Sequence, residues 1–165
     1  MAKALLIVDL EGIPGVDRPE QLIFGGPGHD WAIEQMHAAT HEALDVLKQV
    51  DRVTDVRIAD AHRSGAPYNL DARRFPGHEV CFTDDMYGGA MLDGVTAVAC
   101  VGMHASARSG GFGAHTVAVH TGWKLGEQVL NESLLVQLLA AERGVPTWFT
   151  AGDDVLAREV DGVLP

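Results

Sequence analysis

The sequence predicts an α/β protein, a three-layer sandwich with a mostly parallel central sheet and helices on both faces. Two observations carry this prediction: short apolar runs recur along the chain, and helical periodicities fill the stretches between them. The chain has 165 residues without an evident linker or internal repeat, so residues 1–165 are expected to form a single domain. The runs expected as strands are Ala4–Val8, Val53–Ala59, Thr96–Val101, Thr116–His120 and Thr147–Ala151.

The longest helix is expected between the first two strands. Five apolar side chains recur there at close to every 3.6 residues, which gives one apolar stripe with acidic residues elsewhere. Asp30 precedes the stripe and is a suitable residue for the N-cap. The stripe consists of Ile33, Met36, Leu44, Leu47 and Val50.

Two more helices are expected in the last third of the chain. Residues Glu132–Arg143 form the first, and Asn131 can cap its start. A short helix over Val155–Val160 follows the last strand, and Asp153 and Asp154 before it are interpreted as capping residues. Strands and helices therefore alternate, and in such α/β sheets ligands bind beyond the carboxyl ends of the strands.

Composition and charge restrict the class of protein. The net charge of −11 argues against a nucleic-acid partner, and no apolar run approaches the roughly 18 residues that a membrane span needs. Two cysteines are too few for a disulfide framework and the N-terminus lacks a secretory signal, so a cytoplasmic protein is expected. Five of the eight histidines are expected at the surface or in loops: His29, His37, His41, His78 and His120.

Metal-binding side chains follow three of the expected strands. The segments are "VDLEG" with Asp9 and Glu11, "RIADAHRSG" with Asp60 and His62, and "ACVGMHASA" with His104. Because side chains alternate along an extended chain, Asp9 and Glu11 point the same way, as do Asp60 and His62. One histidine at a strand end is commonly structural, but three such ends at one sheet edge favour a metal site.

Two further residues extend this candidate site. Glu132 lies at the start of a helix, where an acid also favours the helix dipole, and His115 ends the Gly-rich loop "ASARSGGFGA". Two histidines with three carboxylates suit two zinc ions, although manganese or cobalt also bind such ligands. His115 is either free to act on a substrate or an incidental residue of a surface loop. Asp60 is expected either to orient a metal ligand by hydrogen bonding or to cap a turn at the end of its strand.

The motifs resemble those of the zinc-dependent D-aminopeptidases found with bacterial dipeptide-transport operons. The resemblance rests on "VDLEGIPG", "ADAHRSG", "VGMHASA" with His115 eleven residues after His104, the helix at Glu132, and "GVPTWFTAGDD". It implies a ring-shaped homo-oligomer that hydrolyses short peptides or amides with an N-terminal D-residue, typically D-alanine. It also implies that Asp9 bridges two zinc ions, that Glu11 and His62 complete the first and His104 and Glu132 the second, and that His115 is catalytic.

The expected mechanism joins both lines of reasoning. Zinc-bound water attacks the scissile amide, and His115 acts as general acid/base, although the family description makes it a nucleophile. Family members continue past the point where this chain stops, and that C-terminal part is expected to contribute to oligomer contacts and the substrate cleft.

Two alternatives therefore stay open. One is a zinc-binding oligomeric protein whose peptidase activity is lost or altered. The other is an isochorismatase-like cysteine hydrolase using Cys100, although a buried structural cysteine is the commoner situation at such a position.

Overall fold

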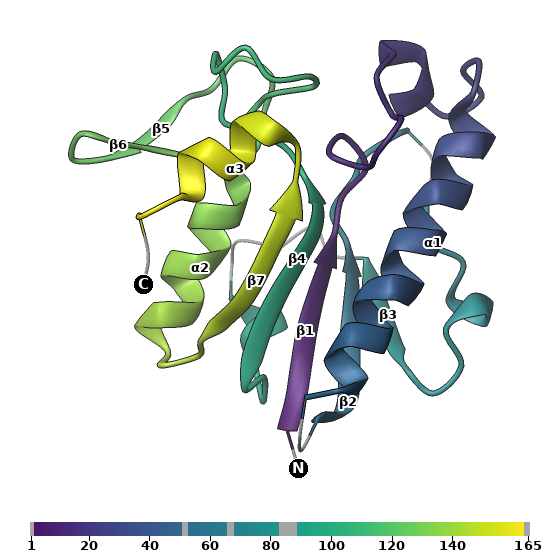
Figure 1. The fold of residues 1–165 in the computed structure, drawn as a ribbon, viewed down its shortest axis with the longest axis vertical. Coiled ribbons are helices and arrows are strands. Elements are labelled where there is room, and N and C mark those ends of the chain that lie inside the picture. The colour runs from purple at the N-terminus through teal and green to yellow at the C-terminus, as the bar shows by residue number, and fades with distance from the viewer. Residues whose placement is uncertain (1, 51–52, 66–67, 83–88, 164–165) are drawn as a thin grey trace.

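A computed structural model describes residues 2–50, 53–65, 68–82 and 89–163 of the chain. At its centre lies a five-stranded sheet with the order β3–β2–β1–β4–β7, in which neighbouring strands are parallel (Figure 1). The predicted parallel sheet is confirmed. Its strands are β1 (Ala2–Val8), β2 (Val53–Asp60), β3 (Glu79–Phe82), β4 (Ala97–Met103) and β7 (Thr147–Gly152).

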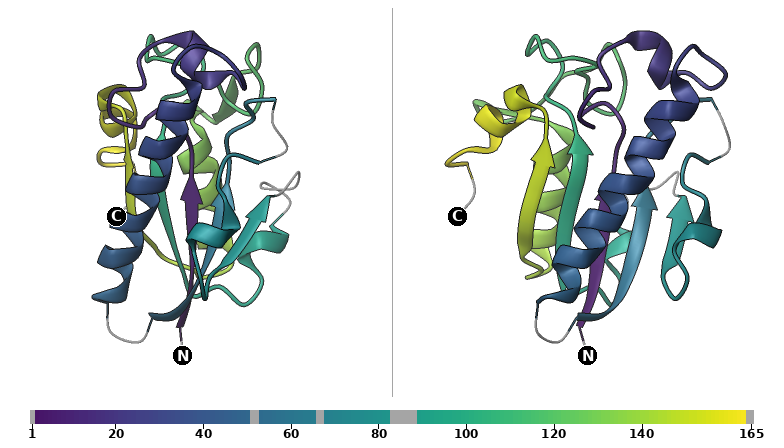
Figure 2. Two further views of the ribbon diagram at one scale, coloured as in Figure 1. Left: turned by 90° about the vertical axis from the view of Figure 1, so that its right-hand side faces the viewer. Right: turned by 45° about the vertical axis from the view of Figure 1, so that its right-hand side comes forward.

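Helices cover both faces of the sheet, as predicted, and they are α1 (His29–Lys48), α2 (Glu132–Glu142) and α3 (Asp154–Val160). Figure 2 shows α1 and α2 on opposite faces, with α3 beyond the carboxyl end of β7. The side chains of β1 alternate between the two layers. Leu6 and Val8 belong to the core under α1, whereas Leu5 and Ile7 belong to the core under α2.

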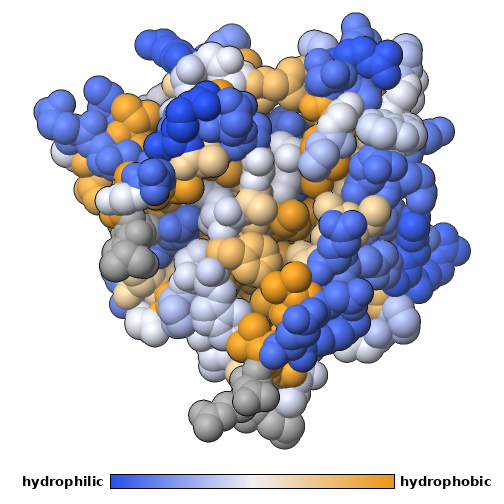
Figure 3. Space-filling model, viewed as in Figure 1, coloured by the Kyte–Doolittle hydropathy of each residue, from blue (hydrophilic) through white to orange (hydrophobic). Residues whose placement is uncertain are grey.

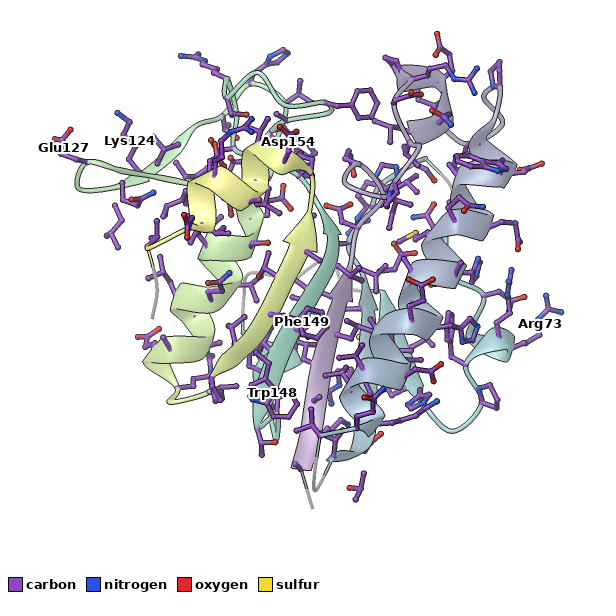
Figure 4. The ribbon with its side chains drawn as sticks, viewed as in Figure 1. Arg73, Lys124, Glu127, Trp148, Phe149 and Asp154 are labelled. Carbon is purple, nitrogen blue, oxygen red and sulfur yellow. The ribbon has the colours of Figure 1, made fainter. Side chains whose placement is uncertain are left out.

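The face that carries α1 is covered unevenly. Val101 of β4 and Phe149 of β7 stay partly exposed there, and apolar side chains gather between α1 and β7 (Figure 3; Phe149 is labelled in Figure 4). A cavity of about 330 Å³ lies between them, lined on the helix side by Ala39, Ala43 and Val46. The α1 layer thus protects the middle of the sheet more fully than its β7 edge.

The start of α1 differs from the prediction. Gly28, with φ +80°, is the N-cap residue, and Asp30 lies inside the first turn, where its charge still suits the helix dipole. The start lies earlier because the buried His29 is held by a bond between Nδ1 and the Gln21 carbonyl oxygen at 2.9 Å. At the other end, Val50 of the predicted stripe lies beyond the helix and is exposed.

Of the two later helices, α2 begins at the predicted Glu132, whereas α3 begins at Asp154, one residue before the predicted Val155. The Asn131 side chain accepts a hydrogen bond from Leu134 N and caps α2, and Asp153 accepts one from Leu156 N and caps α3. Asp154 is the first residue of α3 and does not cap it. Within the described part of the chain, no helix has both the length and the apolar character that crossing a bilayer requires.

The predicted strand Thr116–His120 is wrong. The segment makes only an isolated bridge between Thr116 and Ala118. Val117 between them has φ +66°, which a β-branched residue rarely adopts and which breaks the extended conformation that pairing needs. The segment therefore forms a loop, and its apolar side chains are not packed in the sheet.

Several short elements were not predicted. β3 closes one edge of the sheet, and β5 (Trp123–Leu125) pairs with β6 (Gln128–Leu130) in a hairpin that projects from the body, with Lys124 and Glu127 near its tip (Figure 4). These strands are too short to give a clear alternation of polar and apolar residues. Among the residues that the structure describes, 3₁₀ helices cover Pro19–Leu22, Ala72–Arg74 and Ala90–Leu92.

The surface assignment of histidines is wrong for His29 and His37, both of which are 3% exposed. His37 Nδ1 lies 2.9 Å from the Ile33 carbonyl oxygen, and its Nε2 accepts a hydrogen bond from Asp71 N. Each buried ring therefore bonds to backbone groups. These two histidines hold loops against α1 and take no part in the cluster of ligands described next.

Candidate metal centre

Three predicted site segments leave the sheet at one level. Val8 of β1 lies opposite both Asp60 of β2 and Val101 of β4, so the carboxyl ends of these strands are aligned. The residues that follow meet at that edge, as parallel pairing requires. The side chains brought together are those of Asp9 and Glu11 after β1, His62 after β2, His104 after β4, and Glu132 at the start of α2.

Asp9 lies between two histidines, and each of its carboxylate oxygens faces a different one. Oδ1 is 3.7 Å from His62 Nδ1, and Oδ2 is 3.4 Å from His104 Nε2. Glu11 lies on the first side, with Oε2 3.0 Å from His62 Nδ1, and Glu132 on the second, with Oε1 3.8 Å from His104 Nε2. The result is two three-residue groups that share Asp9, each with one ligand atom per residue within 4.8 Å of the others.

Backbone carbonyl groups orient the histidine rings of the site. In each ring one nitrogen lies at hydrogen-bond distance from a carbonyl oxygen, which leaves the other nitrogen facing the carboxylates. This is the usual arrangement of metal-binding histidines, since the outer hydrogen bond fixes the tautomer and the ring plane. The pairs are His62 Nε2 with Leu22 O at 2.9 Å, His104 Nδ1 with Ala105 O at 2.9 Å, and His115 Nδ1 with Gly113 O at 2.8 Å.

The site concentrates negative charge away from water, since Asp9, Glu11 and Glu132 are 2%, 6% and 5% exposed. Burial and the charge of Asp9 raise the pKa of Glu11. Burial disfavours the charged form of His62, yet its interactions with Asp9 and Glu11 raise its pKa to about 11. Burial also opposes ionisation of Asp9, but His62 and His104 hold its pKa below the usual range. The buried carboxylates of this cluster thus strongly favour a positive charge beside them, on a histidine ring or a bound cation.

These residues fit zinc. Histidine nitrogen and carboxylate oxygen are its usual ligands together with thiolate, and both are present on each side of Asp9. In addition, His104 Nε2 is buried and has no hydrogen-bond partner among the described residues. Such an atom is costly to bury unless something else binds it. A cation between His104, Asp9 and Glu132 would satisfy it.

His115 reaches the site from the loop that follows β4. Its ring stacks on that of His104, with centroids 4.2 Å apart, and its Nε2 lies 3.5 Å from Glu132 Oε1. The next residue, Thr116, is fully buried: its hydroxyl accepts from Ala107 N and donates to the Leu130 carbonyl oxygen. The loop is therefore anchored directly beside the predicted catalytic histidine.

Asp60 has a role that differs in detail from the one expected. Its carboxylate accepts hydrogen bonds from the backbone N–H groups of His62, Asn69 and Leu70, at 3.2, 2.7 and 3.1 Å. The Asn69 side chain in turn donates to the His62 carbonyl oxygen. Asp60 thus holds the backbone of the loop that carries His62, whereas the His62 ring is oriented by Leu22. Positions 66 and 67 of this loop lie outside the described residues.

Two glycines that the sequence analysis did not select allow the segment after β1 and the end of β4 to approach each other closely. Gly12 N donates to Gly102 O, and a Cβ on Gly12 would lie 1.9 Å from the Met103 carbonyl oxygen. Gly102 has φ +71°, and a Cβ there would lie 2.1 Å from Asp9 O. Their positions, directly after Glu11 and two residues before His104, were the signal available in the sequence.

A cleft of about 810 Å³ opens over this cluster. The members of the cluster that line it are Asp9, Glu11, His62, His115 and Glu132, whereas His104 is fully buried, and Arg63 also lines the cleft. Apolar walls come from two loops, with Leu22 and Ile23 on one and Val117 and Val119 on the other. The volume lies within the range of small-ligand sites, and one polar end with apolar walls suits a short peptide.

Comparison with known proteins places the chain in a family. The sequence profile described as D-aminopeptidase matches residues 2–165. The chain belongs to the D-aminopeptidase family. A comparison with curated proteins gave no match.

A solved structure supports the fold of this D-aminopeptidase family member. The Zn-dependent D-aminopeptidase DppA from Bacillus subtilis, described as a self-compartmentalizing protease, is similar with a TM-score of 0.79 and 22% sequence identity. The match covers 95% of this chain and 58% of that one, so the chain spans under two thirds of the length of DppA. At this identity the likeness establishes the fold alone.

The cysteine-hydrolase alternative does not agree with this family or with the position of Cys100. Its side chain is fully buried in β4 within the α2 core, and burial raises the pKa of its thiol to about 12. The thiolate that such chemistry needs is therefore strongly disfavoured.

We expect iodoacetamide to label Cys81 well before Cys100 in the native protein, because Cys81 is only partly buried. Peptide mass spectrometry after timed alkylation measures both rates, and unfolded protein provides the control in which they become similar. Rapid native labelling of Cys100 would revive the cysteine-hydrolase alternative.

Proposed function

We propose that this chain is a zinc-dependent aminopeptidase that hydrolyses short peptides or amides with an N-terminal D-residue. One ion would be held by Asp9, Glu11 and His62, and a second by Asp9, His104 and Glu132. The observation that carries this proposal is the position of Asp9, whose two carboxylate oxygens face different histidines. A carboxylate placed in this way can bridge two cations.

Zinc bound there would polarise the scissile carbonyl group and lower the pKa of a water molecule toward neutrality. His115 would act as the general acid/base. Because its Nδ1 is bound to the Gly113 carbonyl oxygen, Nε2 is the basic atom, and it faces the cleft floor. Nε2 would accept the proton of the attacking water as the new C–O bond forms, and would donate it to the amine as the C–N bond breaks. Glu132, 3.5 Å away, would stabilise the intervening imidazolium.

The family description supports an N-terminal D-residue as the substrate feature, and the shape of the cleft supports a short substrate. The apolar walls formed by Leu22, Ile23, Val117 and Val119 favour small uncharged side chains near the scissile bond. DppA is described as self-compartmentalizing, and by analogy we propose a ring-shaped homo-oligomer for this protein.

Metal content per chain tests the proposal directly. Protein purified without added metal or chelator is expected to contain close to two zinc ions per chain by elemental mass spectrometry. Removing the metal with a chelator should abolish release of the amine from D-alanyl amides, and added zinc should restore it. L-alanyl amides are the matched substrates for the stereochemical part of the proposal.

Two results would overturn parts of it. Protein that takes up no zinc, even when zinc is supplied and the excess removed, would refute the metal site. Zinc binding without hydrolysis of D-aminoacyl amides would leave a zinc-binding protein without this activity.

A further inference from the structure

Glu159 on α3 connects the two segments that bring His104 and Glu132 to the site. One of its carboxylate oxygens accepts a 2.6 Å hydrogen bond from Ser106 Oγ. The other accepts hydrogen bonds from Ser106 N and Asn131 Nδ2, both at 2.9 Å. Ser106 lies two residues after His104, and Asn131 directly precedes Glu132. The Glu159 carboxylate therefore links the chain segment that carries His104 to the segment that carries Glu132.

The groups that Glu159 binds are themselves fixed. Asn131 is fully buried and Ser106 is 2% exposed, so both depend on protein partners for their hydrogen bonds. Asn131 uses its Oδ1 to cap α2 through Leu134 N, which leaves Nδ2 for Glu159. The same amide thus defines the first turn of α2, where Glu132 lies, and ties that turn to α3.

A second acid of the α3 segment contacts the same strand end. Asp153 Oδ2 lies 3.2 Å from Ala105 N, which donates to it, while Oδ1 caps α3 through Leu156 N. Figures 1 and 2 show α3 above the carboxyl ends of β7 and β4, beside the start of α2. In contrast, no contact of Glu159 found in the described residues reaches the segments that carry Glu11 and His62.

We propose that Glu159 is a positioning residue for the half of the metal site formed by His104 and Glu132. This inference rests on the proposed function and adds that the two halves are supported by different parts of the fold. Substitution of Glu159 should therefore lower the affinity for the zinc ion held by His104 and Glu132, and leave the affinity for the other zinc ion unchanged. Groups that hydrogen-bond to the metal ligands themselves typically contribute 10- to 100-fold to metal affinity, and Glu159 bonds to residues beside the ligands, so we expect an effect at the lower end of this range.

Zinc titration of the metal-free full chain against a chelating dye tests the proposal without reference to activity. In Glu159→Ala, one zinc equivalent should bind about 10-fold more weakly than in the wild type, and the affinity for the other should be unchanged. Glu159→Gln should stay within about 3-fold of the wild type, a much smaller effect than that of removing the partner. Its amide oxygen can still accept from Ser106 N and Asn131, and its amide N–H can donate to Ser106 Oγ.

Asp154→Asn is the matched control on the same helix. Asp154, labelled in Figure 4, is exposed and its carboxylate pairs with Arg158 of the same helix, so this variant should bind zinc like the wild type. Thermal unfolding of each variant in chelator separates a general loss of stability from a selective loss of affinity. If Glu159→Ala does not fold, Ser106→Ala takes its place, because it removes only the 2.6 Å hydrogen bond to Glu159. This variant should also bind one zinc equivalent more weakly than the wild type.

The possible failures are distinguishable. A wild-type chain that binds no zinc would overturn the proposed function on which this inference rests. Normal zinc uptake by the wild type with the same two affinities in Glu159→Ala, or in Ser106→Ala if the former is unfolded, would overturn the positioning role alone. Equal weakening of both equivalents would also overturn it.

Discussion

Replacing His115 by alanine is expected to lower kcat at least about 100-fold while leaving zinc content unchanged, because general acid/base catalysis typically contributes 10²- to 10⁴-fold. The geometry that leads to this expectation is specific. The Gly113 carbonyl oxygen engages Nδ1, so Nε2 is left to exchange protons within the cleft. Turnover of a D-alanyl amide and zinc per chain are measured on the same preparation.

His120→Ala is the control, since His120 is an exposed histidine five residues further along the same loop. The structure also offers a competing result, because His115, Glu11 and His104 form a third group whose ligand atoms lie within 4.8 Å of one another. If His115 were a zinc ligand, its removal would lower zinc content together with activity. Near wild-type turnover would exclude both roles.

The core of the candidate site could be predicted from sequence because it depends on two local rules. Alternation along an extended chain predicts Asp9 and Glu11 on one side, and parallel pairing brings consecutive carboxyl ends to one edge. Both side chains do meet there, although Glu11 already lies in the turn that follows β1. The aligned register of β1 with β2 and β4 then brings His62 and His104 beside Asp9.

The parts that could not be predicted depend on contacts between distant segments. Leu22 orients His62 across 40 positions of sequence, and Glu159 reaches Ser106 across 53. Neither pairing has a local pattern, since a backbone carbonyl group is present at every residue and a helical glutamate is commonly exposed. The same limit explains His29 and His37, which were expected at the surface but bind buried backbone groups.

The misassigned strand at Thr116–His120 shows a different limit. Its composition favours an extended conformation, since valines and threonine are common in strands. Its conformation is instead determined by the site: Val117 adopts φ +66° and its N–H donates a 2.8 Å hydrogen bond to Glu132 Oε1. A non-glycine residue in this region costs free energy and commonly marks a functional segment. The error therefore falls where a loop lines the cleft.

The number of zinc ions lost on mutation provides the sharpest test of the bridging role of Asp9. We expect Asp9→Asn to lose both ions, because Asp9 belongs to both groups and its removal leaves only two ligands on each side. His62→Ala and Glu132→Gln each alter one group, so each should lose one ion.

Elemental analysis of the three variants should thus give values near zero, one and one, against two in the wild type. The metal-free Asp9→Asn protein should remain folded. Its amide oxygen can still accept the hydrogen bond from Leu10 N, and the substitution removes the negative charge that, after burial, raises the pKa of Glu11. Thermal unfolding in chelator checks this point. If Asp9→Asn instead kept one ion, Asp9 would be a ligand of a single zinc, and the second group would need a different bridge.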